Sequence, residues 1–98
     1  MARYDVYRAN DHDLLLDLQA DILDHLATRF AVLLRPRDRA EPPLRRLNPI
    51  FVIDGIDYVM VTQVVASIPK RELRHPLATL AAEADAIRDA LDMLLIGF

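Results

Sequence analysis

A predicted β-hairpin restricts the fold of this chain more than any other feature. Two runs rich in β-branched residues, 50–53 and 56–62, flank the pair Asp54-Gly55. Aspartate and glycine both tolerate the positive φ angles of a type I′ turn, which suits antiparallel strands. Apolar residues occupy both faces of the second run. We therefore expect an antiparallel sheet that is covered on both sides, by a helix, by a curled part of the sheet or by a second subunit.

Three earlier segments also have strand patterns. Residues 2–7 carry two tyrosines and a valine, and residues 30–34 are continuously apolar. In residues 14–19, Leu14, Leu16 and Leu18 alternate with Leu15, Asp17 and Gln19. A period of two indicates a strand with one apolar face. Residues 35–46 hold three prolines and five arginines. That composition predicts a loop, because proline cannot donate to a ladder and charged side chains resist burial.

A C-terminal helix is predicted from about residue 82 to about residue 95. Its apolar stripe comprises Ile87, Leu91, Leu94 and Leu95. Its charged stripe comprises Asp85, Arg88, Asp89 and Asp92. The helical period explains both stripes, and the spacing of Arg88 and Asp92 suits an i,i+4 ion pair.

The chain closes on the apolar run 93–98, and Ile96 has an unusual position in it. Ile96 lies seven residues after Asp89 and four after Asp92. A continued helix would therefore place it in the charged stripe, where an exposed apolar side chain is a candidate for contact with a partner. In the alternative, Gly97 caps the helix and Ile96 packs under the sheet or in a dimer interface.

The composition favours a small protein that associates with a second copy. Hydrophobic residues make up 53% of the 98 positions, and a domain of this size leaves much apolar surface uncovered, so we expect a twofold homodimer. Cysteine is absent. No signal peptide or membrane span is recognisable, so we expect a cytoplasmic protein. The net charge of −3 gives no electrostatic reason to bind DNA directly.

Residues that often carry chemistry form no recognisable catalytic or metal site, and no cofactor is expected. Five aspartates and two histidines crowd residues 11–25. They lack the turn glycine and distal glutamate of a calcium loop and the paired ligands of a zinc site. We interpret this segment as a solvated acidic loop. The arginines of residues 35–46 are interrupted by Asp38 and Glu41, so they too are interpreted as a solvated loop.

Six segments resemble the CcdB toxins, the toxin half of plasmid and chromosomal toxin–antitoxin pairs. The matching segments are 1–7, 17–24, 47–49, 59–63, 66–69 and 91–98. The resemblance covers the whole chain, residues 1–98, as one domain. The acidic segment 17–24 and the C-terminal signature are specific in combination.

This resemblance implies a mainly β fold with a C-terminal α-helix: a strongly bent, SH3-like antiparallel sheet with a small extra sheet. It implies a homodimer whose chain ends lie close to the twofold axis. The protein would not be an enzyme. It would poison DNA gyrase by binding the A subunit and trapping the enzyme on cleaved DNA. A CcdA-like antitoxin would neutralise it through a disordered segment that folds on binding, and their complex would repress its own operon through the antitoxin's DNA-binding part.

The resemblance also implies which residues bind gyrase. The implied set is Ile96, Gly97, Phe98, Ile22, Leu23 and Asp92. Gly97 matches the family, and Phe98 keeps an apolar side chain at the end. Ile96 stands where the best-known plasmid toxin has a tryptophan, and Asp92 stands where it has an asparagine.

Two other functions remain open from the sequence. The departure at Ile96 motivates an antitoxin-binding dimer with weak or lost gyrase poisoning. A ribonuclease is the other alternative, because MazF toxins share the barrel fold and cut RNA. The acidic balance of the chain and the lack of a paired base and acid in a basic groove argue against RNA cleavage.

Overall fold

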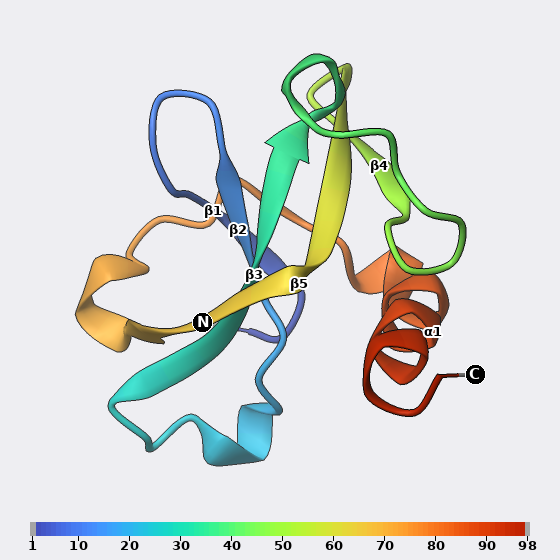
Figure 1. Ribbon diagram of the computed structural model, residues 1–98. Coiled ribbons are helices and arrows are strands. Elements are labelled where there is room, and N and C mark those ends of the chain that lie inside the picture. The colour runs from blue at the N-terminus through green and yellow to red at the C-terminus, as the bar shows by residue number, and fades with distance from the viewer. Residues whose placement is uncertain (1, 98) are drawn as a thin grey trace.

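A bent antiparallel sheet makes up most of the structure, and a helix packs against one of its faces (Figure 1). The computed structural model describes residues 2–97. Within that range the strands are β1 Asp5–Arg8, β2 Leu14–Asp17, β3 Thr28–Pro36, β4 Ile50–Ile53, β5 Ile56–Pro69 and β6 Ala78–Thr79. Their order across the sheet is β4-β5-β3-β2-β1-β6. This architecture, with α1 Ala84–Leu95 at its end, confirms the predicted fold class.

Short 3-10 turns connect several of these elements. They are η1 Asp21–Leu23, η2 Arg37–Arg39, η3 Lys70–Glu72 and η4 Ala81–Glu83. None of the four turns contains a buried residue. Each turn is therefore held by its flanking contacts rather than by a core of its own. No helix within residues 2–97 is long and apolar enough to cross a membrane.

The hairpin between β4 and β5 forms as predicted. Asp54 has a φ of 51° and Gly55 a φ of 76°, the two positive values that a type I′ turn requires. Ile53 pairs with Ile56 directly across the turn. Local sequence therefore sets this register, because the two-residue turn leaves no room for slippage.

The long ladder between β3 and β5 is where the sheet bends. Its register shifts between Val32, which pairs with Val65, and Leu33, which pairs with Val61. The additional residues on β5 accommodate a local bend. Past Ala31, the last residue of β3 that pairs with β2, residues 28–30 of β3 and 67–69 of β5 continue as a two-stranded arm. The described strands form one sheet, so this arm stands in place of the small extra sheet that the resemblance implied.

Two sequence-based boundaries were wrong at this ladder. Arg35 and Pro36, predicted to lie in a loop, belong to β3 and pair with Val59 and Tyr58. The last pair between β3 and β2 joins Leu34 to Leu14, so Pro36 has a strand neighbour on one side only and its missing donor is tolerated there. β5 also runs well past the predicted end at residue 62, as far as Pro69.

The core lies between α1 and the adjacent face of the sheet. Ile87 and Ala90 are fully buried against residues of β1 to β5. Their buried sheet partners include Val6, Leu14, Leu16, Val32, Leu34, Phe51, Ile53, Tyr58 and Met60. Leu95, which was expected in the buried stripe, is 77% exposed, because the helix contacts the core only through its first turns.

The charged face of α1 forms different ion pairs from the predicted one. Arg88 pairs with Asp85, one turn earlier, and not with Asp92. Asp89 accepts two hydrogen bonds from Arg46, at 2.7 and 3.0 Å. The contact between Arg46 and Asp89 connects the loop that precedes β4 to the helix. Sequence spacing within a helix could not reveal a partner that comes from a distant loop.

Candidate functional site

The C-terminal tail leaves the helix through a left-handed cap. Gly97 has a φ of 91°, and its N–H donates to the carbonyl of Met93 at 3.1 Å. This is the αL motif that glycine favours at a helix end. Among the described residues, apart from the neighbours of Gly97 in the chain and the backbone of the helix itself, no atom lies within 4 Å of the position that a Cβ on Gly97 would take, so conformation rather than space favours glycine. The cap that the alternative interpretation required is therefore present.

Ile96 nevertheless lies on the surface. Its side chain is 59% exposed, so it does not pack under the sheet as the alternative interpretation supposed. It ends a run of exposed apolar residues, of which Met93 and Leu94 are each more than one third exposed. Asp92 is also exposed, and its carbonyl accepts the N–H of Ile96 at 2.8 Å. Phe98 lies outside the described residues.

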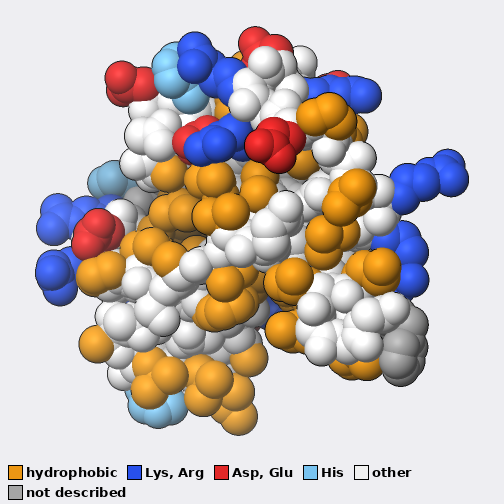
Figure 2. Space-filling model, viewed as in Figure 1, with side chains coloured by type: hydrophobic (Ala, Val, Ile, Leu, Met, Phe, Trp, Pro, Cys, Tyr) orange, Lys and Arg blue, Asp and Glu red, His pale blue; other side chains and the backbone are white. Residues whose placement is uncertain are grey.

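The second predicted group, Ile22 and Leu23, lies in the turn η1. Ile22 is 85% exposed and Leu23 is 41% exposed. Leu26 and Phe30 are each 41% exposed nearby in the chain. In Figure 2, hydrophobic side chains gather at the bottom of the molecule, where this turn lies. The turn therefore presents apolar side chains outward.

The two groups of predicted site residues lie apart within one chain. In Figure 1 the turn η1 lies at the bottom of the molecule and the end of α1 lies to the right. Within residues 2–97, no hydrogen bond or ion pair connects them. Ile22 and Leu23 therefore form one apolar group, and Ile96 and Gly97, beside the charged Asp92, form the other.

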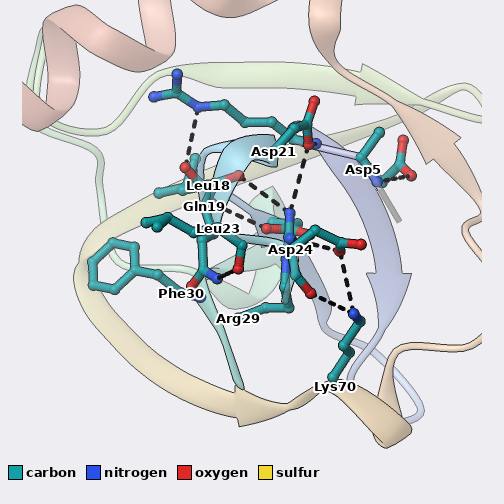
Figure 3. Close-up of polar contacts among 12 residues, drawn as sticks. Asp5, Leu18, Gln19, Asp21, Leu23, Asp24, Arg29, Phe30 and Lys70 are labelled. Atoms are coloured by element: carbon teal, nitrogen blue, oxygen red, sulfur yellow. Dashed lines mark hydrogen bonds and ion pairs between the residues drawn. The ribbon is translucent and has the colours of Figure 1, made fainter. Parts of the chain in front are cut away.

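The acidic segment was wrongly interpreted as solvated throughout. Asp17 is fully buried, and its Oδ2 accepts a hydrogen bond from Nε of Arg29 at 2.8 Å. The Arg29 side chain is fully buried as well, and it donates to Oδ1 of Asp24 at 3.1 Å and to the carbonyl of Gln19 at 3.1 Å. Figure 3 shows Arg29 beside Gln19 and Asp24. A buried arginine requires such partners, because an unpaired buried charge is very costly.

Sequence reasoning missed Arg29 because nothing local marks it. It precedes the apolar run that was predicted to be the strand, so it was assigned to neither a strand nor a site. The sequence did contain one indication of a buried cation, namely the excess of aspartates in this segment, because a cluster of like charges needs a cation to neutralise it. Its position in the fold was required to identify Arg29 as that cation.

A second acidic residue of the segment is also held by an arginine. Asp13 is 7% exposed, and Arg35 donates to both of its carboxylate oxygens at 3.2 and 3.3 Å. The hydrogen bonds from Arg35 lower the pKa of Asp13 below its ordinary 3.8. Within residues 2–97, no histidine, cysteine or acidic groups converge in a way that could hold a metal ion.

A groove of about 550 Å³ lies beside β5, between that strand and the loop that follows β3. Its lining includes Arg35, Arg39, Glu41, Asn48 and Gln63 together with several valines. None of these described lining residues pairs a nucleophile with a histidine or another adjacent base. The described lining thus contains no Ser–His or Cys–His pair.

The model of one protein family, described as "CcdB protein", matches residues 3–97 of this 98-residue chain. That family consists of toxins of toxin–antitoxin systems and is not a family of catalytic enzymes. The match covers both apolar groups described above, as well as the buried Arg29 with its carboxylates. With nearly every residue included in the match, this chain belongs to the CcdB family.

Proposed function

We propose that this protein is a toxin that poisons DNA gyrase by binding its A subunit and trapping the enzyme on cleaved DNA. The observation that carries the proposal is the outward position of Ile96 at the end of α1, with 59% of its side chain exposed. The proposed contact set is Ile96, Gly97, Phe98, Ile22, Leu23 and Asp92.

The exposed isoleucines are sufficient to contribute substantially to binding. Full burial of such a side chain contributes about 1.5–3 kcal/mol. Scaled by the exposed fractions, Ile96 would contribute about 1–2 kcal/mol and Ile22, at 85% exposed, about 1.5–2.5 kcal/mol. These amounts are typical of residues that anchor an interface, whereas the exposed Asp92 would mainly affect specificity.

We propose further that the active species is a homodimer. The two apolar groups lie apart in one chain, so a single copy offers gyrase two separated contacts. Apolar side chains at the bend of β5 are also exposed, with Val64 at 48% and Val65 at 39%. A twofold partner covers such surface and supplies a second copy of each group. One gyrase A subunit can then contact the tail of one protomer and the turn of the other.

The proposed regulator is a CcdA-like antitoxin, the expected partner of a toxin in such a pair. It would neutralise the toxin by binding the dimer through a segment that folds on binding. Autoregulation of the operon, and plasmid maintenance where the genes are plasmid-borne, would depend on the DNA-binding part of the antitoxin. The toxin itself, with a net charge of −3, has little electrostatic attraction for DNA.

A second candidate function follows from the side chain of Ile96. In the best-known plasmid toxin the corresponding tryptophan stacks on an arginine of gyrase, and isoleucine has no aromatic ring to offer a cation. Loss of an interface tryptophan can cost about 2 kcal/mol or more. The alternative is therefore an antitoxin-binding dimer with weak or lost gyrase poisoning.

Overexpression without antitoxin, followed by a gyrase cleavage assay on the purified protein, tests the proposal. The wild type is compared with a chain that lacks the last three residues and with Ile96→Ala. Ile56→Ala is the matched control, because Ile56 is 51% exposed but lies at the distant β4–β5 hairpin. We expect the wild type and the control to trap cleaved DNA and the two tail variants to lose this activity. Equal trapping by the truncated chain would refute the proposed site, and no trapping by the wild type would favour the alternative.

A further inference from the structure

Arg29 connects three separate stretches of chain around the turn that carries Ile22. Its Nε donates to Asp17 at the end of β2, its Nη2 donates to the carbonyl of Gln19, and its Nη1 donates to Asp24 just after η1. The three distances lie between 2.8 and 3.1 Å. The arginine thus binds the chain on both sides of η1.

The turn has little else to hold it in place. η1 is three residues long and contains no buried side chain. Its own hydrogen bonds are weak constraints, because a single 3-10 turn is marginal in isolation. The Oδ1 atom of Asp21 lies 3.8 Å from Nη2 of Arg29 and accepts the N–H of Arg3 at 2.8 Å. The contacts that fix this segment are therefore polar, and Arg29 is central to them (Figure 3).

The carboxamide of Gln19 supplies a second, smaller clamp on the same turn. Its Nε2 donates to the carbonyls of Leu23 and Thr28, at 3.2 and 3.1 Å, and its Oε1 accepts the N–H of Phe30 at 3.0 Å. The backbone carbonyl of Gln19 is itself held by Arg29. The two side chains thus form one connected network, in which the arginine has the greater number of partners.

We propose that Arg29 is a positioning residue, which holds η1 in the one conformation that presents Ile22 and Leu23 to the partner. In its functional part, this inference rests on the proposed gyrase contact. Arginine suits the role better than lysine, because its planar fork donates in three fixed directions at once. A lysine would still neutralise Asp17 but could not also hold Asp24 and the Gln19 carbonyl.

The consequence for binding is preorganisation. A turn that is already ordered loses no further conformational entropy on binding, whereas a mobile turn loses that entropy when it binds. Ordering even one residue reduces affinity by roughly tenfold, and η1 with its flanks contains several. Arg29 would therefore affect affinity without touching the partner.

Two variants separate this role from general stability. Arg29→Lys keeps the buried positive charge beside Asp17 but removes the fork. Asp24→Ala removes one arm of the clamp, together with the 3.4 Å ion pair between Asp24 and Lys70, at a side chain that is 51% exposed, so the fold should tolerate it. Arg37→Lys is the matched control, since Arg37 and Asp57 form an exposed pair at 3.5 Å away from η1.

The order of the turn can be measured without gyrase. The chain contains no tryptophan, so Ile22→Trp introduces a single fluorescent reporter into η1. We expect the anisotropy of this reporter to fall in the Arg29→Lys and Asp24→Ala backgrounds and to stay constant in the Arg37→Lys background. Amide exchange of Leu23, Asp24 and Leu26, whose N–H groups bond within the turn, should accelerate in the same two variants while the melting temperature of Asp24→Ala changes little.

Affinity for the gyrase A subunit is then measured with Ile22 intact. We expect binding by Arg29→Lys and Asp24→Ala to be roughly tenfold weaker or more, with Arg37→Lys unchanged. Unchanged anisotropy and exchange in Asp24→Ala would overturn the inference, and so would a looser turn with undiminished affinity. If the wild type fails to bind gyrase, the proposed function fails, whereas the anisotropy and exchange results still decide whether Arg29 orders the turn.

Discussion

Replacement of Asp17 by asparagine tests the buried ion pair that connects β2 to β3. Both Asp17 and Arg29 have fully buried side chains and lie 2.8 Å apart. The substitution keeps the size of the side chain and an oxygen that can accept the N–H of Gln19, but it removes the charge. Arg29 would then be buried with only the more exposed Asp24 and Asp21 as carboxylate partners.

The expected loss of stability is about 3–5 kcal/mol, the usual cost of removing one partner from a buried pair. Asp24→Asn is the matched comparison, because Asp24 pairs with the same arginine but is 51% exposed. Solvent screening should keep its cost at about 1 kcal/mol or less. The two variants thus remove the same kind of charge from Arg29 but differ in burial, and Asp24→Asn also removes an exposed ion pair with Lys70 at 3.4 Å.

Urea unfolding at fixed protein concentration measures both values, since association of the proposed kind would make the measured stability depend on concentration. With an m-value of about 1.5 kcal/mol/M, Asp17→Asn should lower the midpoint by about 2–3 M and Asp24→Asn by less than about 1 M. Equal midpoints for the two variants would refute the reasoning. That result would mean that water or a rearranged partner compensates the buried guanidinium in the absence of Asp17.

Three further predictions concern other parts of the sheet and the helix. The hydroxyl of Tyr7 is buried without a hydrogen-bond partner among residues 2–97, so Tyr7→Phe should leave the unfolding free energy unchanged or raise it by up to about 1 kcal/mol. A clearly lower unfolding free energy in urea would show that the hydroxyl has a partner. Because Arg35 lowers the pKa of Asp13, the contribution of Asp13 to stability is present above pH 3.8 and is lost as the pH falls through the lower folded-state pKa. Asp13→Asn should therefore reduce the loss of stability at acidic pH, and an unchanged loss would argue against this pair. Ile87→Ala should lower the unfolding free energy by about 2–5 kcal/mol because Ile87 is fully buried, whereas Leu95→Ala, at a side chain 77% exposed, should lower it by less than about 0.5 kcal/mol. Thermal melts that rank the two variants in the other order would contradict the packing described for α1.

The sequence predicted the features that local rules determine. Asp54-Gly55 predicted its turn, because only a few residue types adopt two consecutive positive φ angles. The period of the last helix predicted its position and its charged face. For Ile96 the sequence left two possibilities open, exposure on a continued helix or packing after a Gly97 cap, and the structure combines the cap with 59% exposure.

What the sequence did not predict depends on contacts between distant segments. The length of β5 is set by pairing with β3 across a shifted register, and no local pattern encodes that shift. The exposure of Leu95 depends on where the sheet ends beneath the helix. Arg29 and Asp17 are twelve residues apart, so their pairing could be recognised only once β2 and β3 lay side by side.

The distribution of burial along α1 has a consequence for how such a toxin can diverge. Ala90 is the last fully buried residue in the described chain, and residues 92–97 are all exposed. Under the proposed contact set, substitutions at residues 92–96 would alter what the protein recognises at little thermodynamic cost to its fold, whereas Gly97, with its φ of 91°, is constrained by the helix cap. On that proposal, recognition of a new target would require changes at only a few exposed positions, while the buried residues of the sheet and of the first turns of α1 stay unchanged.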